Sequence, residues 1–263
     1  MPKSIIEIVG EGRDFVVINK PAGISVTADR SGAEDLLTLL KRQLPNEGDL
    51  RLVHRLDKYT SGVMLIAKNR DAQSLLSSHF EKRLIEKTYL ALSIGAIPSR
   101  RRTINVPIIR SKRDARVMCV SCKRGKVAKT SFDILADFGT ICLLKVVPKT
   151  GRTHQIRLHL AHIGLPVAID PLYGSSKPVM LSDYKDRYSR KKGQTEKPLI
   201  ERLTLHAYQI ELPESAFGPA VYTAKLDKKF AAAIKMLTKH NPNGGGAFQD
   251  PDNLAKILAG EKL

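Results

Sequence analysis

Residues 51–62 read RLVHRLDKYTSG, and the apolar run GVMLIA occupies residues 62–67. A short apolar run bounded by turn residues is typical of a buried strand. The segment before it is polar, and its single carboxylate, Asp57, stands among Arg51, His54, Arg55 and Lys58. The stretch therefore predicts a buried strand that follows directly on a charged loop, and the loop is the first candidate for a functional site.

Strands outnumber helices on either side of this loop. We expect further strands at residues 14–21, 87–95, 130–135, 141–147 and 203–212, and a hairpin within the basic segment after residue 98. Helices are predicted at 34–44, from Asn69 or Asp71 onward, across Ile156, Leu160 and Ile163, and at 227–239. Because strands and helices do not alternate regularly, the sequence predicts an α+β fold with a mixed, mainly antiparallel sheet flanked by helices.

The 263 residues carry no run of 18 apolar residues, and the N-terminus lacks the apolar block of a signal peptide. Three cysteines are too few and too irregular for a disulfide framework. The sequence is thus typical of a soluble cytoplasmic protein with no membrane partner.

Charge points to a polyanionic partner. Lysine and arginine number 44 against 26 acidic residues, a net charge of +18. Residues 98–130 hold 11 basic side chains against Asp114 alone, and residues 175–198 hold seven against three acidic ones. Basic surfaces attract phosphate backbones and release their counterions, so nucleic acid is the expected partner, and a merely solvated basic surface is the alternative.

Asp57 is the best candidate for a reactive carboxylate. The cationic side chains around it favour the ionised form, which suits a nucleophile or a base and not a proton donor. The alternative is an ordinary surface ion pair.

Two other classes of protein are alternatives to an enzyme that uses Asp57. A metal-dependent RNA hydrolase would need a ligand cluster. His154, His159 and His162 share one predicted helix, but no H-E-x-x-H arrangement is present, and Cys119 with Cys122 lacks two further ligands at matched spacing. An RNA-binding protein without catalytic activity would keep the basic surface but would have no need of Asp57.

The motifs together resemble the RluA-type pseudouridine synthases, which modify uridines in ribosomal and transfer RNA. HRLDKYTSG resembles the catalytic motif of that family. Blocks that resemble its other motifs follow in the family's order: NKPAGISV (19–26), FEKRLIEKTYLAL (80–92), GKVAKT (125–130), TGRTHQIRLHLAHIGLPVAIDPLYG (150–174) and LTLHAYQIEL (203–212). The resemblance covers residues 12–235.

The resemblance implies roles for particular residues and an activity that needs no cofactor. Asp57 would be the catalytic aspartate, and Tyr89 would pack against the uracil as a candidate for the final proton removal. Arg157 would pair with Asp57, and Arg55 would enter the base stack as the target nucleotide leaves it. Arg152 and His154 would position the RNA backbone.

The resemblance also predicts a domain organisation. We expect one catalytic domain over residues 1–240, without a separate N-terminal RNA-binding module, and a Gly/Pro-containing tail over 241–263. The basic segments 98–130 and 175–198 would then select the RNA, and the protein is expected to act as a monomer.

Overall fold

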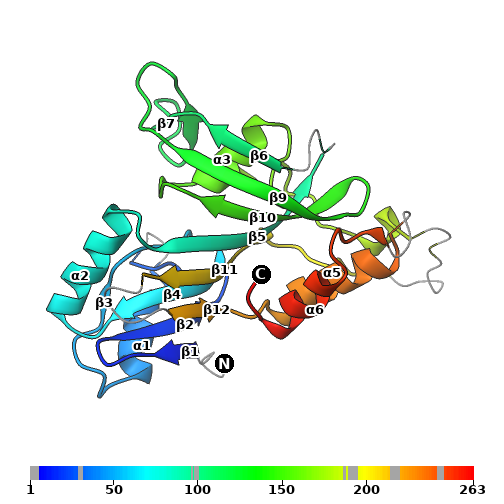
Figure 1. Ribbon diagram of the computed structural model, residues 1–263. Helices are drawn as coiled ribbons and strands as arrows, with labels where there is room; N and C mark the ends of the chain where they lie inside the picture. Colours follow the sequence, from blue (N-terminus) through cyan, green and yellow to red (C-terminus); the bar gives the residue numbers. More distant parts are fainter. Residues whose placement is uncertain are drawn as a thin grey trace. The chain divides into compact units, whose positions relative to one another are not determined.

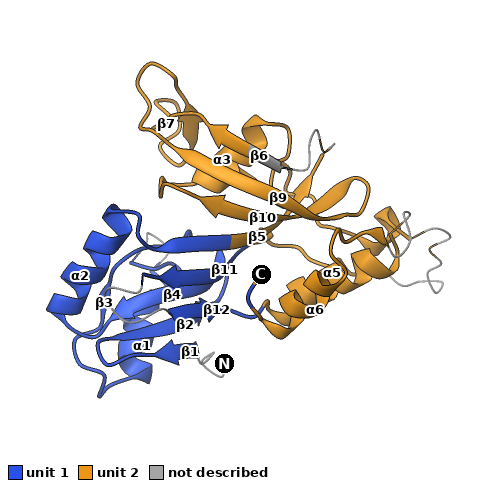
Figure 2. Cartoon of the chain, viewed as in Figure 1, with its two compact units in different colours: residues 1–88, 206–225, 262 blue, residues 89–205, 226–261, 263 orange. Residues whose placement is uncertain are grey.

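The computed structural model describes residues 6–28, 32–95, 97, 101–185, 188, 195–213, 220–241 and 246–263. The chain divides into two compact units, which Figure 2 shows in different colours. Unit 1 comprises residues 1–88, 206–225 and 262, and unit 2 comprises residues 89–205, 226–261 and 263. The division falls inside one strand, β5 (Glu86–Ile94).

Unit 1 is a sheet with two helices (Figure 1). Its strand order is β1–β2–β4–β11, with β3 also paired to β4 and β12 to β11. The strands are β1 (Glu7–Glu11), β2 (Phe15–Lys20), β3 (Arg51–Leu52), β4 (Ser61–Ala67), β11 (Leu205–Leu212) and β12 (Ala220–Thr223). The helices are α1 (Leu36–Gln43) and α2 (Arg70–Glu81). All seven residues of β4 are buried, as the apolar run predicted.

Side-chain caps fix where the helices begin. Asp35 accepts a hydrogen bond from the backbone N–H of Thr38 before α1, and Asn69 accepts one from Ala72 before α2. Such caps satisfy N–H groups that have no partner inside the helix. The predicted helices at 34–44 and after Asn69 are confirmed, because a capping residue precedes an amphipathic run in each.

Unit 2 contains a second set of paired strands, in the order β5–β10–β9–β6, and a separate two-stranded hairpin, β7–β8. The remaining strands are β6 (Arg101–Asn105), β7 (Ile108–Arg110), β8 (Met118–Val120), β9 (Lys129–Asp137) and β10 (Ile141–Pro148). The helices are α3 (Gln155–His162), the 3₁₀ turn η1 (Leu181–Asp183), α5 (Lys228–Lys239) and α6 (Asp252–Ala259). The hairpin predicted within the basic segment is confirmed.

Part of the C-terminal tail is buried against unit 2. Phe248 is buried and meets the ring of Phe138 edge to face at 6.1 Å. The backbone N–H of Asp137 donates to the carbonyl of Ala247 at 2.9 Å, so this part of the tail extends the edge of β9. The apolar residues Ala247, Phe248 and Ile257, which follow the Gly/Pro-rich start of the tail, are buried.

One close contact makes the sheet of unit 1 mixed. β4 and β11 run parallel, with Gly62 opposite Ala207. The pairs β1–β2, β2–β4, β3–β4, β5–β10, β9–β10, β6–β9, β7–β8 and β11–β12 are antiparallel. Gly62 has φ +116°, and a Cβ there would lie 2.1 Å from the carbonyl oxygen of Ala207. Only glycine allows this approach. The predicted α+β class with a mixed, mainly antiparallel sheet is confirmed.

His54 ties the loop before β4 to the sheet. Its Nε2 accepts a hydrogen bond from the backbone N–H of Leu65 at 2.9 Å, and its ring stacks on Phe80 at 4.4 Å. An accepting Nε2 requires the neutral ring with its proton on Nδ1. Burial, together with the positive charge of Lys87, lowers the pKa of His54 from 6.5 to about 3.

This contact makes stability depend on pH. Below pH 6.5 the unfolded chain protonates His54 while the folded chain does not, so the stabilisation present at neutral pH is lost as the pH falls toward 3. Between pH 7 and pH 5 the wild type should lose about 2 kcal/mol of unfolding free energy more than His54→Gln, which keeps an acceptor but does not titrate. Urea unfolding at both pH values measures the difference, and equal losses would contradict the assignment.

Candidate active site

Asp57 occupies the turn that leads into β4. The backbone N–H of Thr60 donates to the carbonyl of Asp57 at 3.1 Å, which closes the turn, and β4 begins at the next residue, Ser61. Asp57 is half-buried, and Arg55, two residues before it, is exposed. A half-buried carboxylate on a turn anchored to a buried strand can meet a ligand from solvent without moving its backbone.

A buried ammonium group supports this turn. Lys20, at the end of β2, is 0% exposed, and its Nζ donates to the carbonyl oxygens of Pro21 at 2.9 Å, Lys58 at 3.1 Å and Thr60 at 3.0 Å. An ammonium has three N–H groups, so these three acceptors match them. A buried charge is costly unless such hydrogen bonds compensate it, and here the compensation fixes the backbone on both sides of the turn.

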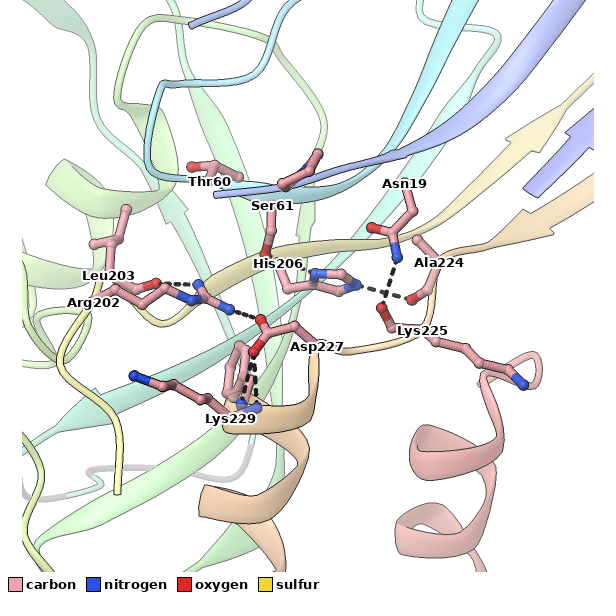
Figure 3. Close-up of polar contacts among 12 residues, drawn as sticks. Asn19, Thr60, Ser61, Arg202, Leu203, His206, Ala224, Lys225, Asp227 and Lys229 are labelled. Carbon is pink, nitrogen blue, oxygen red and sulfur yellow. Dashed lines mark hydrogen bonds and ion pairs between the residues drawn. The ribbon is translucent and has the colours of Figure 1, made fainter. Parts of the chain in front are cut away.

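The start of β4 is fixed a second time by a histidine on β11. Figure 3 shows His206 between Ser61 and the carbonyl of Ala224. Because a carbonyl only accepts, Nε2 of His206 carries the proton that is donated to Ala224 at 2.9 Å. Nδ1 then accepts from the Ser61 hydroxyl at 2.9 Å. Ser61 therefore has a structural partner, in keeping with the absence of a serine-hydrolase motif around it.

In unit 2, Arg157 on α3 forms a buried ion pair. Its Nε and Nη2 each donate to one oxygen of Asp170 at 2.7 Å, a two-point contact that fixes the plane of the guanidinium. Asp170 also accepts from the backbone N–H of Leu172 at 3.0 Å. The guanidinium carbon lies 5.2 Å from the centre of the Tyr173 ring. The ion pair and the ring contact together orient the guanidinium group.

The same tyrosine connects the N-terminus of α3 with the basic hairpin. The Tyr173 hydroxyl accepts from the backbone N–H of Met118 in β8 at 2.8 Å and lies 2.9 Å from Nδ1 of His154. Which of the two groups donates in this second contact depends on the tautomer of His154. His154 has φ +53°, a left-handed conformation held here by this contact at the start of the helix.

The other two predicted residues of unit 2 lie on its sheet and beside the hairpin. Tyr89 on β5 stands opposite Val146 of β10 and packs, half-buried, against the core of unit 2. Arg152 lies before α3, and its Nε donates to the carbonyl of Val127 at 3.2 Å.

The comparisons with known proteins agree on one family. Residues 14–162 match the model of the RNA pseudouridylate synthases. The chain belongs to the RNA pseudouridylate synthase family. It is 32% identical over 225 residues to the ribosomal large subunit pseudouridine synthase C of Buchnera aphidicola (subsp. Acyrthosiphon pisum), covering 85% of this chain and 68% of that protein.

Further relatives give the same result. The corresponding protein of Pasteurella multocida is 33% identical over 235 residues, covering 87% of this chain and 68% of its own. Among solved structures, human RNA pseudouridylate synthase domain containing 1 superimposes with a TM-score of 0.71 at 27% identity, over 98% of this chain and 97% of that one. The resemblance seen in the sequence is confirmed, and the chain is an isomerase that acts on RNA.

The pseudouridine synthase has its predicted site residues in both units. Asp57 and Arg55 belong to unit 1, while Tyr89, Arg152, His154 and Arg157 belong to unit 2. Within unit 2, Tyr173 brings His154 and Arg157 together. The described partner of Arg157 is Asp170, and its predicted pairing with Asp57 stays a prediction.

Sequence reasoning missed the residues that position the site. Lys20, Asp170, Tyr173 and His206 were not singled out, although each lies in a stretch that carries the family resemblance. One feature of the sequence could have drawn attention to Lys20. It ends an apolar run that is expected to be buried, and lysine is rare in buried positions unless it is paired.

Neither a metal-ligand cluster nor a membrane-spanning helix occurs among the described residues. No group of three or more histidines, cysteines, aspartates or glutamates in the described part of the pseudouridine synthase is placed to hold a metal ion. Within the same residues, no helix has the length and apolar character needed to cross a membrane.

Replacing Lys20 tests its support of the Asp57 turn. Lys20→Met leaves three carbonyls without their donor, so the unfolding free energy should fall by about 3 kcal/mol, and the reaction rate at saturating RNA should fall more than the affinity for RNA. Lys41→Met is the matched control, because Lys41 is half exposed on the same unit. Urea unfolding and single-turnover kinetics measure both effects. Stability and rates equal to those of the control would show that the ammonium does not hold the turn.

Proposed function

We propose that this pseudouridine synthase isomerises specific uridines in ribosomal or transfer RNA, with Asp57 as the catalytic carboxylate after base flipping. The names of the relatives, which are ribosomal large subunit pseudouridine synthases, favour ribosomal RNA of the large subunit. The observation that carries the role of Asp57 is its turn, which is closed by Thr60 and held by buried Lys20.

The reaction exchanges one bond to the ribose for another. The bond between the ribose carbon and ring nitrogen one breaks, the uracil turns, and the same ribose carbon bonds to ring carbon five. Carbon five then loses its hydrogen as a proton, while nitrogen one gains a proton, so atoms balance without a cofactor. Reaching that bond inside a stack requires flipping the nucleotide out, at a cost of a few kcal/mol.

An ionised carboxylate on a fixed turn suits this chemistry. Asp57 can attack the sugar, attack the base, or remove a proton from the ribose, and each of these roles needs the charged form. Because Asp57 is half-buried, its carboxylate stays accessible from solvent, and a flipped nucleotide can reach it.

The remaining predicted residues take the roles that the family resemblance implies. Tyr89 packs against the uracil and is the candidate for removal of the proton from carbon five. Arg157 pairs with Asp57, with its guanidinium already oriented by Asp170. Arg55 enters the stack in place of the target nucleotide, and Arg152 and His154 position the RNA backbone. The contact of His154 with Tyr173 holds it beside the basic hairpin.

RNA selection is assigned to the basic segments. Residues 107–129, which include the hairpin and the loop after it, expose eight basic side chains: Arg110, Lys112, Arg113, Arg116, Lys123, Arg124, Lys126 and Lys129. Of these, Arg116 is paired with Asp114. A small apolar cluster of Ile108, Ala128 and Leu158 attaches the hairpin to α3. Arg100, the side chains of Arg101 and Arg102, and much of the basic stretch 175–198 lie outside the described residues.

The remaining expectations are part of the same proposal. Residues 1–240 act as one catalytic domain followed by the tail 241–263, the protein works as a monomer in the cytoplasm, and no membrane or cofactor takes part.

Asp57→Asn tests the catalytic assignment. The substitution keeps the size of the side chain but removes its charge, so release of tritium from ring carbon five of labelled ribosomal RNA transcripts should fall at least about 1000-fold. RNA binding should persist. Asp71→Asn, the same chemical change at an exposed position of α2, is the control. Full tritium release by Asp57→Asn would refute the role of Asp57. Release by the wild type from transfer RNA transcripts alone would show that transfer RNA, and not ribosomal RNA, is the substrate.

Charge reversal on the hairpin tests RNA selection. In Arg113→Glu/Arg124→Glu two exposed cations become anions, so RNA affinity should fall, and each lost phosphate contact should reduce the slope of log affinity against log salt by about 0.7 to 0.9. Lys235→Glu/Lys239→Glu on α5 changes the net charge equally on another surface of unit 2. Filter binding at several salt concentrations separates the two. Equal losses would mean that net charge alone, and not the hairpin, determines binding.

A further inference from the structure

Tyr59 is an exposed aromatic side chain on the turn of Asp57. Its side chain is 55% exposed, whereas every other tyrosine and phenylalanine in the described part of the chain is buried or half-buried. The protein contains seven tyrosines and no tryptophan. A ring with this exposure is available for contact with a ligand.

The backbone on either side of Tyr59 is fixed. The carbonyl of Lys58 accepts from the buried Lys20 ammonium and from the backbone N–H of Gly23 at 2.8 Å. On the other side, Thr60 is buried, and its carbonyl accepts from Lys20 at 3.0 Å. Tyr59 therefore has an exposed ring on an immobilised backbone. A ligand that contacts the ring loses little free energy in ordering it.

We propose that Tyr59 stacks on the base of a nucleotide that flanks the target uridine and thereby contributes to the choice of substrate. The inference rests on the proposed role of Asp57. Two residues span at most about 7 Å of chain, so the backbone that carries the ring lies close to the residue that the flipped uridine would meet. Flipping removes one base from the stack and exposes the faces of its neighbours.

Stacking explains why the residue is aromatic. A tyrosine ring offers a large flat face with only two side-chain torsions to fix, and every base has a face that can stack on it. Arg55, on the other side of Asp57 in the sequence, is assigned to the gap left by the uridine. Tyr59 then covers a flanking base, so the two residues hold the RNA on both sides of the flipped position.

Kinetics on a large-subunit ribosomal RNA transcript labelled at uridine carbon five test the contact. Tyr59→Ala should raise KM about 5- to 150-fold, the effect of one lost base–aromatic contact, with a much smaller change in the single-turnover rate at saturating RNA. Tyr59→Phe keeps the ring and should retain most of the affinity. Leu75→Ala removes another exposed apolar side chain of unit 1 and serves as the control.

Two kinetic outcomes would overturn the proposal. If Tyr59→Phe loses as much as Tyr59→Ala, the hydroxyl makes the contact and the ring does not stack. If Tyr59→Ala lowers the saturating rate as much as it weakens binding, the side chain supports the turn and not the RNA. Thermal unfolding of each variant identifies any loss that comes from the fold.

A fluorescent variant gives a readout that does not depend on activity. Tyr59→Trp introduces the only tryptophan of the chain, and stacking on a base should quench its emission when the same transcript is added. Leu75→Trp should respond little. Absence of quenching at Tyr59→Trp under conditions where the RNA is bound would contradict stacking.

The two readouts also separate this inference from the proposed function. Quenching without tritium release by the wild type would mean that the ring stacks on RNA while the proposed substrate or role of Asp57 is wrong. Release by the wild type with neither quenching nor a KM effect would leave the function standing and refute the role of Tyr59.

Discussion

A buried ammonium group holds the turn from which this protein presents its candidate catalytic carboxylate. Lys20 donates to the carbonyls of Lys58 and Thr60, at the two ends of the turn. The buried hydrogen bond of His206 with Ser61 and the close approach of Gly62 to Ala207 fix the strand that follows. The loop therefore keeps one shape although its sequence is polar. A reactive group on such a loop needs no reorganisation when substrate arrives. Preorganisation of this kind is a main source of the electrostatic stabilisation of transition states by enzymes.

In unit 2, buried contacts also fix the position of a charged side chain, that of Arg157. Asp170 fixes the guanidinium of Arg157 by a two-point contact, and Tyr173 connects that neighbourhood to His154 and to the first residue of β8. The basic hairpin and the start of α3 thus share one tyrosine. A change in the hairpin that displaced Tyr173 would alter the surroundings of Arg157, so the hairpin proposed to contact RNA is joined to that arginine by neighbouring contacts and not by charge alone.

The sequence predicted the parts of this fold that have local signatures. An apolar run marks β4, and a capping residue before an amphipathic segment marks α1 and α2. The two-residue strand β3 was missed, because so short an element has no periodicity. The supports of the site were missed for another reason. Lys20 finds its acceptors 38 and 40 residues later, and His206 lies 145 residues from Ser61, so nothing in the flanking sequence of either residue reveals its partner. Asp57 itself was found through its basic surroundings and its motif.

The difference between surface and buried cations bears on how a carboxylate can work beside RNA. Phosphates approaching the site compete for exposed cations such as Arg55. Lys20 is fully buried and bound to three carbonyls, so phosphates do not reach it, and its charge stays beneath the turn when RNA arrives. Exposed charges are also screened by salt, whereas a buried one is screened much less. The surface lysines and arginines can therefore serve affinity, while the buried lysine preserves the setting of the carboxylate in the complex.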